Sequence, residues 1–357
     1  MSVGHERGGI VGKKDRDSVV GVAVVGAGYW GPNLIRNFYQ LRDSRVLWVV
    51  DLDEGRLAHV RELYPSIRTT TSFDDVLNDP EVEAVVLAVP VRAHASLGVK
   101  ALRAGKHVLI EKPLATSSGE CEDLIKAAEE AERILMVGHV FEYTSAVRKV
   151  KELLDSGALG NLYYVNSQRL NLGLFRNDVN VIWDLAPHDI SILLHVLGGR
   201  MPRGVRAVGA AHINPKVEDV ATISLDFDDG LIAFIQVSWL DPKKVRQTVL
   251  VGSQQMLVYD DIQPTEKIWL YDRGVEAPPR YDTYDEFPYT YRYGDITIPR
   301  IAGAEPLRTE AAHFLECIRT GQRPLTDGYS GLRVVKILEA TTASLRNGGA
   351  RIELATE

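Results

Sequence analysis

The sequence predicts an α/β domain with a doubly wound parallel sheet, followed by an α+β domain built on a mostly antiparallel sheet. Short apolar runs alternate with amphipathic stretches up to about Val140. Beyond that point, longer alternating strands and hairpin signals take over, with helices between some of them. Residues 1–18 contain no apolar stretch, so we expect a mobile tail before a first domain at 19–140 and a second domain at 141–357.

Five apolar runs predict the strands of the first domain. They are rich in valine, isoleucine and leucine, as strands buried on both faces of a parallel sheet are. Amphipathic segments of helical length lie between them, for example at 32–41 and 117–133. The runs are VVGVAVV (19–25), VLWVV (46–50), AVVLAV (84–89), HVLI (107–110) and ILMVG (134–138).

The second domain is expected to combine helices with antiparallel strands. A helix at 145–156 leads into a long alternating strand at 162–170, and another helix is expected at 185–197. Two closing helices, at 309–319 and 330–346, could pack back on the first domain. Further strands, with a hairpin signal at Asp229-Gly230, are ATISLDF (221–227), LIAFIQVSW (231–239), QTVLVGS (247–253) and QMLVYD (255–260).

Composition argues against several classes of protein. The net charge is -7 and no basic stripe stands out, so a nucleic-acid partner is not expected. Cys121 and Cys317 lie far apart and predict idle thiols in a reducing compartment. No trio of histidines and acidic residues has metal-site spacing, so no metal is expected. No apolar run is long enough to cross a bilayer, so we expect a cytoplasmic protein with no membrane partner.

A glycine-rich turn, GAGYWG, follows the first apolar run directly. Gly26, Gly28 and Gly31 would supply a tight turn, a close backbone approach to a pyrophosphate, and close packing of helix on strand. The start of the following helix offers free N–H groups to the phosphates. The turn therefore predicts a dinucleotide-binding Rossmann domain, and we include Tyr29 and Trp30 among the cofactor-binding residues.

The second apolar run leads to an acid, Asp51, about 20 residues after the last glycine. A carboxylate there can accept hydrogen bonds from both ribose hydroxyls of NAD, and it would repel the 2′-phosphate of NADP. Arg56 lies a few residues further on and could approach such a phosphate. We therefore expect NAD, with NADP as the alternative.

The fourth apolar run ends in Glu111-Lys112-Pro113. Together with GAGYWG, this motif resembles the glucose–fructose oxidoreductase/inositol dehydrogenase (Gfo/Idh/MocA) family, over about residues 19–355. The resemblance implies a Rossmann domain joined to an open-faced sheet. It also implies that Lys112 reaches the nicotinamide and the reacting hydroxyl, with Glu111 at the cofactor. The alternative is a surface lysine before a proline that starts a helix.

The family's second signature, an Asp and a His four residues apart, is met by Asp184 and His188. Residues at this spacing share a helix face, so both side chains can point into one pocket. A neutral imidazole is suited to removing a hydroxyl proton near pH 7, and Asp184 could orient the site. Alternatively, Asp184 caps the helix, with Pro187 in its first turn. The glycines usual before the Asp are replaced by VNVIW (179–183).

That departure is similar to a particular branch of the family. The stretch RLNLGLFRNDVNVIWDLAPHDI (169–190), with GYWG, resembles enzymes that act on nucleotide-linked sugars, particularly 3-dehydrogenases of the UDP-N-acetylglucosamine type. Arg169 and Asn171 would share one sheet face, and the arginine could bind a substrate carboxylate or phosphate. An ordinary salt bridge on the sheet face is the alternative.

Two further histidines are candidate cofactor residues. His94 follows Val89-Pro90, at a place where members of the family touch the cofactor, and Pro90 is counted with it. His139 ends the fifth apolar run near the same crevice. Each could equally be a structural histidine with satisfied hydrogen bonds.

These observations predict an NAD-dependent oxidoreductase that oxidises a pyranose hydroxyl, at C3 of a nucleotide-linked sugar. A ketosugar reductase, a dehydrogenase of a free sugar or cyclitol, and a non-catalytic NAD-sensing regulator are the alternatives. We also expect a homo-oligomer, dimer or tetramer. Its interface is predicted on an exposed sheet face at Leu231–Trp239, with Ile235, Val237 and Trp239 forming the apolar patch.

Overall fold

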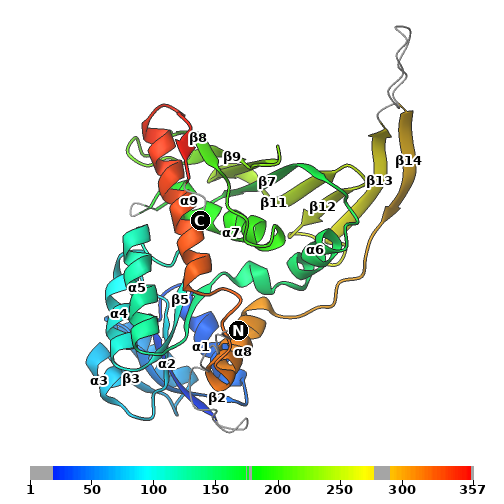
Figure 1. The fold of residues 1–357 in the computed structure, drawn as a ribbon. Coiled ribbons are helices and arrows are strands. Elements are labelled where there is room, and N and C mark those ends of the chain that lie inside the picture. The colour runs from blue at the N-terminus through cyan, green and yellow to red at the C-terminus, as the bar shows by residue number, and fades with distance from the viewer. Residues whose placement is uncertain (1–18, 174, 177–178, 277–289, 355–357) are drawn as a thin grey trace, which may run out of the picture. The chain divides into compact units, whose positions relative to one another are not determined.

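The computed structural model describes residues 19–173, 175–176, 179–276 and 290–354 (Figure 1). Its contacts divide the chain into two compact units. Unit 1 comprises the chain up to Val140 together with Glu305–Val335, and unit 2 comprises Phe141–Ala304 and the chain from Lys336 onward. The helix α9 (Gly328–Arg346) therefore begins in unit 1 and ends in unit 2. The expected tail at 1–18 lies outside the described residues.

Unit 1 is built on six parallel strands in the order β3-β2-β1-β4-β5-β6. This confirms the predicted doubly wound α/β domain. The short edge strand β3 was not predicted, because its residues Arg-Thr-Thr form no apolar run. The strands are β1 (Val20–Val25), β2 (Ser44–Val50), β3 (Arg68–Thr70), β4 (Ala84–Leu87), β5 (His107–Glu111) and β6 (Leu135–Gly138).

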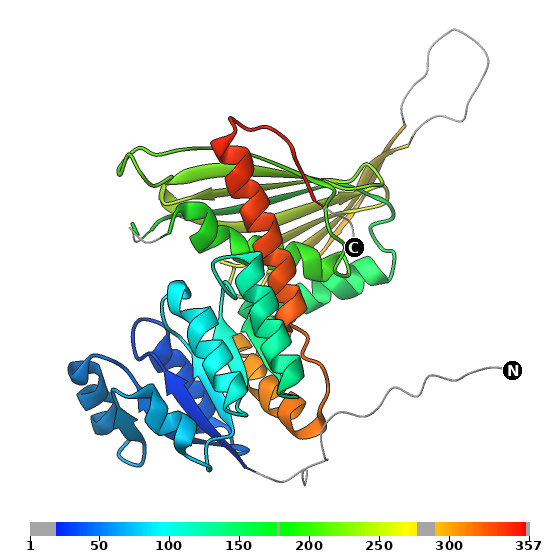
Figure 2. The ribbon, with the colours of Figure 1, turned by 60° about the vertical axis from the view of Figure 1, so that its left-hand side comes forward.

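Helices pack around this sheet. Every residue of β1 and β4 is buried, as expected for strands covered on both faces. The helices α4 and α5 lie side by side in unit 1 (Figure 2). The chain returns to the unit in α8, whose Phe314 ring meets Phe38 edge-on. The helices are α1 (Gly31–Gln40), α2 (Glu54–Leu63), α3 (Phe73–Asn78), η1 (Val91–Ala93), α4 (His94–Arg103), α5 (Ser118–Glu130) and α8 (Pro306–Thr320).

Unit 2 is built on nine strands in the order β14-β13-β12-β11-β7-β10-β9-β8-β15. Among the described strands of this sheet, only β7 and β10 pair in parallel, so the predicted mostly antiparallel sheet is confirmed. The strands are β7 (Leu162–Leu172), β8 (Gly204–Ala210), β9 (Val220–Asp226), β10 (Ile232–Ser238), β11 (Leu240–Gly252), β12 (Met256–Asp260), β13 (Ile268–Glu276), β14 (Thr290–Thr297) and β15 (Ile352–Glu353).

Helices cover one face of this sheet (Figure 1). The helix α7 (Val181–Val196) packs on β7, β9 and β10, and α6 (Ser145–Asp155) packs on β12. The short helix η2 (Val140–Tyr143) precedes α6. The core of unit 2 therefore lies between the sheet and the helices α6 and α7.

The predicted exposed patch on β10 is wrong. Ile235, Val237 and Trp239 have relative exposures of 1%, 0% and 1%, because they point to the side covered by α7. The exposed side chains of the strand are Ile232 and Phe234. Apolar residues occupy both faces of this strand, so the two-residue period could not decide which face is buried.

The start of α7 also differs from the prediction. The helix begins at Val181 instead of residue 185, and the Asn180 side chain caps it by accepting a hydrogen bond from the backbone N–H of Trp183 at 3.1 Å. Pro187 lies inside the helix. Asp184 is therefore not the cap.

Candidate active site

The glycine-rich turn after β1 is shaped by close backbone packing. Gly26 has φ +97°, and a Cβ atom on Gly31 would lie 2.0 Å from the carbonyl oxygen of Gly26. A Cβ on Gly28 would meet only the Arg56 guanidinium, at 3.6 Å. Two glycines thus allow the turn to form, while Gly28 leaves open surface where a ligand can approach.

No described side chain caps the N-terminus of α1. Its N-cap residue, Trp30, makes no capping hydrogen bond with its side chain, and the first turn contains no acidic residue. The N–H groups and the positive end of the helix dipole therefore face no carboxylate of this turn. The Tyr29 side chain is 86% exposed beside them. This arrangement fits the pyrophosphate of a dinucleotide.

Asp51 is buried at the end of β2 and braces the turn. Its carboxylate accepts hydrogen bonds from the backbone N–H of Ala27 at 2.7 Å and of Asp53 at 2.9 Å. The Arg56 guanidinium lies 3.4 Å from the same carboxylate, and its side chain is half exposed. The carboxylate and the guanidinium therefore stand together at the position where a ribose or its phosphate is recognised.

Lys112 follows β5 in a turn with a cis peptide bond to Pro113. Next to it, burial raises the pKa of Glu111 to about 7, against the opposing effects of the Lys112 charge and of hydrogen bonds from the Lys112 backbone N–H and the Trp30 side chain. The indole of Trp30 thus connects the glycine-rich turn to the end of β5. Nothing in the sequence pattern indicated this contact.

His139 lies at the end of β6, fully buried. Burial, and next the positive charge of Lys112, lower the pKa of His139 to about 3, so the imidazole is neutral at physiological pH. Neither ring nitrogen has a hydrogen-bond partner among the described residues. Buried polar groups normally have a hydrogen-bond partner, so this imidazole is unusual, and its contact with the cofactor stays a prediction.

His94 has the structural role that the sequence left open. Its Nδ1 lies 2.9 Å from the carbonyl oxygen of Pro113, and its Nε2 lies 2.9 Å from that of Val89. Burial lowers the pKa of this imidazole, although both carbonyls favour the charged ring. The ring joins the turn after β4, which contains Pro90, to the turn that carries Lys112. A direct contact of His94 or Pro90 with the cofactor stays a prediction.

In unit 2, Asp184 and His188 lie one turn apart on α7. The Trp239 indole donates a hydrogen bond to the Asp184 carboxylate at 3.1 Å, and the Arg176 guanidinium lies 3.6 Å from it. The His188 ring packs edge-on against the ring of Phe141, with centroids 5.0 Å apart. Both candidate residues are partly buried, and each is supported by an aromatic side chain.

Arg169 forms a buried ion pair on the helix-covered face of the sheet. Its Nε donates to the Asp189 carboxylate at 2.6 Å, and both side chains are almost completely buried. Asn171 lies two residues further along the same strand and is partly buried. The structure thus shows the salt bridge that the sequence left open for Arg169, and substrate binding by Arg169 or Asn171 stays a prediction.

Sequence reasoning missed the aromatic partners of the α7 pair. Phe141 and Trp239 lie in separate segments, and their meeting with α7 depends on how the helix packs on the sheet. Asn180 was also missed, although asparagine before an apolar helix start is a preferred cap. That signal was present in the sequence and would have placed Asp184 inside the helix.

Within the described residues, no group of three or more histidine, cysteine, aspartate or glutamate side chains could hold a metal ion. No described helix is both long enough and apolar enough to cross a membrane.

A Rossmann sheet with a glycine cradle, an acid at the end of β2 and a lysine after β5 defines an NAD-binding oxidoreductase. Comparison with known proteins gives the same class. Residues 20–139 match the model of an oxidoreductase family with an NAD-binding Rossmann fold, and residues 147–258 match the GFO/IDH/MocA C-terminal domain. The chain belongs to the Gfo/Idh/MocA family.

Relatives within the family have different substrates. The UDP-N-acetylglucosamine 3-dehydrogenase of Acidithiobacillus ferrooxidans is 28% identical over 319 residues, which are 87% of this chain and 93% of that protein. The scyllo-inositol 2-dehydrogenase (NADP(+)) IolW of Bacillus subtilis is 25% identical over 91% of this chain and 92% of its own length. The structure of GenD2 from gentamicin A biosynthesis, in complex with NAD, has the same fold, with a TM-score of 0.80 at 24% identity over 98% of this chain and 100% of that chain.

Proposed function

We propose that the protein is an NAD-dependent dehydrogenase that oxidises a pyranose hydroxyl, at C3 of a nucleotide-linked sugar, to a ketone. The observation that carries the proposal is that a dinucleotide-binding unit keeps Lys112 at the end of β5, while α7 keeps Asp184 and His188 one turn apart. The similarity to a UDP-N-acetylglucosamine 3-dehydrogenase over most of both chains supports the choice of substrate class.

The residues of the chain divide the work of this reaction. The glycine-rich turn, the start of α1 and Asp51 bind and orient the dinucleotide. Bound NAD supplies the hydride acceptor. His188, as a neutral imidazole, takes the proton of the substrate hydroxyl at a ring nitrogen. The ammonium of Lys112 stabilises the negative charge that develops on the substrate oxygen, or relays its proton. Asp184 orients the site.

A ketosugar reductase uses the same groups in reverse, with the imidazolium of His188 returning the proton. A dehydrogenase of a free sugar or cyclitol is the second alternative, and the similarity to a scyllo-inositol dehydrogenase supports keeping it. A non-catalytic NAD sensor is the third, and the presence of both Lys112 and His188 speaks against it, because a binder needs no groups that transfer protons.

A substrate panel separates these proposals. Purified protein is mixed with NAD and with UDP-N-acetylglucosamine, other UDP-sugars, free hexoses or inositols, and absorbance at the NADH band is followed. We expect NADH with a UDP-sugar and a much slower reaction with free sugars and inositols. Turnover of inositol alone would favour the cyclitol reading. Binding of NAD without turnover of any substrate, in either direction, would favour the sensor.

Asp51 is expected to set the choice of cofactor. Asp51→Ala should weaken NAD binding about 10- to 100-fold, the scale of charged hydrogen bonds lost to the ribose hydroxyls. The same change should strengthen NADP binding relative to NAD, because it frees Arg56, now 3.4 Å from the carboxylate, to bind a 2′-phosphate. Titration of both cofactors measures the effect. The gain for NADP should disappear in the double variant Asp51→Ala/Arg56→Ala, and equal affinities for NAD and NADP in the unchanged protein would contradict the account.

The proposed homo-oligomer needs a different face from the one predicted. Tyr164 of β7 is 43% exposed and lies beside Ile232 of β10. Ile232 and Phe234 are each 39% exposed. These side chains lie on the sheet face opposite α7, and an apolar face of this kind is typical of a subunit interface. Sedimentation velocity at micromolar concentration should show a dimer or tetramer, and a monomer would contradict the proposal.

A further inference from the structure

Three side chains in unit 2, those of Asp189, Arg169 and Phe141, form a chain of contacts that starts at the residue after His188 and returns to the His188 ring. The next residue of α7, Asp189, is bound by the Arg169 guanidinium, with Nε at 2.6 Å and Nη2 at 3.4 Å from its two oxygens. The same guanidinium lies over the ring of Phe141, 4.6 Å from its centroid. Phe141 in turn packs edge-on against the His188 ring. The backbone of His188 and its imidazole are therefore both held by contacts that lead to Arg169.

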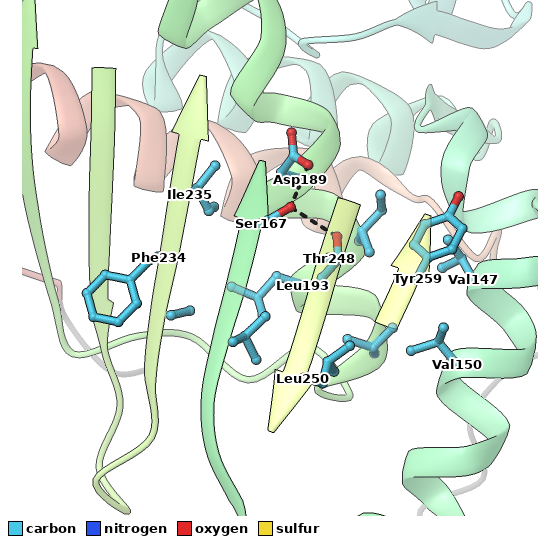
Figure 3. A pocket seen from close by; sticks show the side chains of 14 residues that line it. Val147, Val150, Ser167, Asp189, Leu193, Phe234, Ile235, Thr248, Leu250 and Tyr259 are labelled. Carbon is cyan, nitrogen blue, oxygen red and sulfur yellow. Dashed lines mark hydrogen bonds between the residues drawn. The ribbon is translucent and has the colours of Figure 1, made fainter. Parts of the chain in front are cut away.

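A further hydrogen bond holds the ion pair between Arg169 and Asp189. The Ser167 hydroxyl donates to Asp189 at 2.8 Å and lies 3.0 Å from the Thr248 hydroxyl, as Figure 3 shows. The cavity beneath, lined by apolar side chains of α6, α7 and the sheet, measures about 10 Å³, enough for one water at most. Arg169 itself has a relative exposure of 3%, so it presents almost no surface to a sugar or phosphate.

We propose that Arg169 and Phe141 are positioning residues for His188, and that Arg169 is not a substrate ligand. The inference rests on the proposed role of His188 as the base. Phe141 limits the rotation of the imidazole through edge-to-face packing. Arg169 holds the Phe141 ring by a cation–π contact and holds the helix turn through Asp189.

The arrangement also bears on the protonation of the imidazole. The contacts above link His188 to the charges of Asp189 and Arg169, and Asp184, one turn earlier on α7, carries a further charge paired with Arg176. Glu142 of η2 and His195, further along α7, form a separate buried pair at 3.2 Å. Arg169 and Asp189 cancel each other while both are present, so removing one of them exposes His188 to the charge of the other.

The test is an NMR titration of His188 in the purified protein, with its resonance assigned by comparison with His188→Asn. Phe141→Leu should remove the ring-current shift of the His188 C–H protons, and Phe141→Tyr should keep it. Asp189→Asn leaves the guanidinium uncompensated and should lower the pKa of His188 by about 0.5 to 1 pH unit. Arg169→Met leaves the Asp189 carboxylate uncompensated and should raise the pKa of His188.

An exposed pair elsewhere in unit 2 supplies a control for the change of charge. Arg200 pairs with Asp229 at 2.8 Å, with side-chain exposures of 42% and 54%, and lies 4.9 Å from the centroid of the Phe227 ring. Arg200→Met and Asp229→Asn should leave the His188 titration unchanged. Because breaking a buried pair can unfold a protein, the two Phe141 variants keep the proposal testable without touching the pair.

Turnover adds an independent measurement. Phe141→Leu should lower kcat about 10-fold or more and leave KM for the sugar within a factor of about three, because positioning acts on the chemical step. The proposal is overturned if Phe141→Leu leaves the His188 resonances unchanged. It is also overturned if Arg169→Met raises KM for the sugar more than tenfold at unchanged kcat, the result for a substrate ligand. The NMR results stand even if no substrate turns over, so a failure of the proposed function is recognised separately.

Discussion

His188→Asn should lose about 10²- to 10⁴-fold in kcat, the range for removing a positioned general base, while binding NAD and sugar nearly normally. Asparagine keeps a hydrogen-bonding side chain of similar reach but cannot take up a proton near neutral pH. The base must be neutral when the reaction starts, so turnover of the unchanged enzyme should fall as the pH drops below the pKa of the base, about 6.5 for an ordinary histidine. This acid limb should disappear in the residual activity of the variant. Steady-state kinetics between pH 5 and 9 measure both effects.

A second histidine on the same helix provides the control. His195 forms a buried pair with Glu142, with Nδ1 and Oε2 3.2 Å apart. His195→Asn should lower the melting temperature and keep chemistry per folded molecule, which is the pattern of a structural histidine. Full activity with an unchanged pH profile in a well-folded His188→Asn protein would remove His188 from the mechanism. Partial activity with a displaced acid limb would point to a base shared with Lys112.

Lys112→Met should lower turnover about 10²-fold or more and leave folding intact. Burial raises the pKa of Glu111 against the charge of Lys112, and burial together with the same charge lowers the pKa of His139, so the ammonium stands close to two groups at the carboxyl ends of β5 and β6. Methionine keeps the length of the side chain and removes its charge. Any stabilisation of a developing oxyanion is then lost. The binding of NAD, measured by fluorescence titration, should change much less than kcat.

An exposed lysine of the same unit serves as the comparison. Lys100 pairs with Asp74 at 2.5 Å on the surface, and Lys100→Met should leave kcat and NAD affinity unchanged. A Lys112→Met protein that keeps most of its turnover would show that Lys112 is not catalytic.

Most of the fold could be predicted from the sequence, because its main signals are local. Buried parallel strands are continuous apolar runs, and five of the six strands of unit 1 were found this way. The strand β3 was missed because three polar residues at a sheet edge give no such signal. In β10, apolar residues lie on both faces, and only the packing of α7 determines that Ile235 is buried while Phe234 is exposed.

The candidate site was predictable to the extent that it depends on motifs. GAGYWG, Asp51, Glu111-Lys112-Pro113 and the spacing of Asp184 and His188 are all visible in the chain. Asp189, the partner of Arg169, could not be predicted, because a strand residue and a helix residue meet only after the helix has packed on the sheet. The same holds for Phe141 beside His188 and for Trp30 beside Glu111. Sequence patterns indicate which residues can react, and tertiary packing determines what supports them.

The central claim is that hydride passes from a pyranose carbon to NAD. It is tested most directly with UDP-N-acetylglucosamine that carries deuterium at C3, by incubation with the enzyme and NAD and mass spectrometry of the NADH formed. The account predicts NADH that is one deuterium heavier, together with a 3-keto sugar nucleotide. NADH free of deuterium would show that another carbon is oxidised and would contradict oxidation at C3. The formation of no NADH from this substrate or from other C3-labelled UDP-sugars would contradict the whole account.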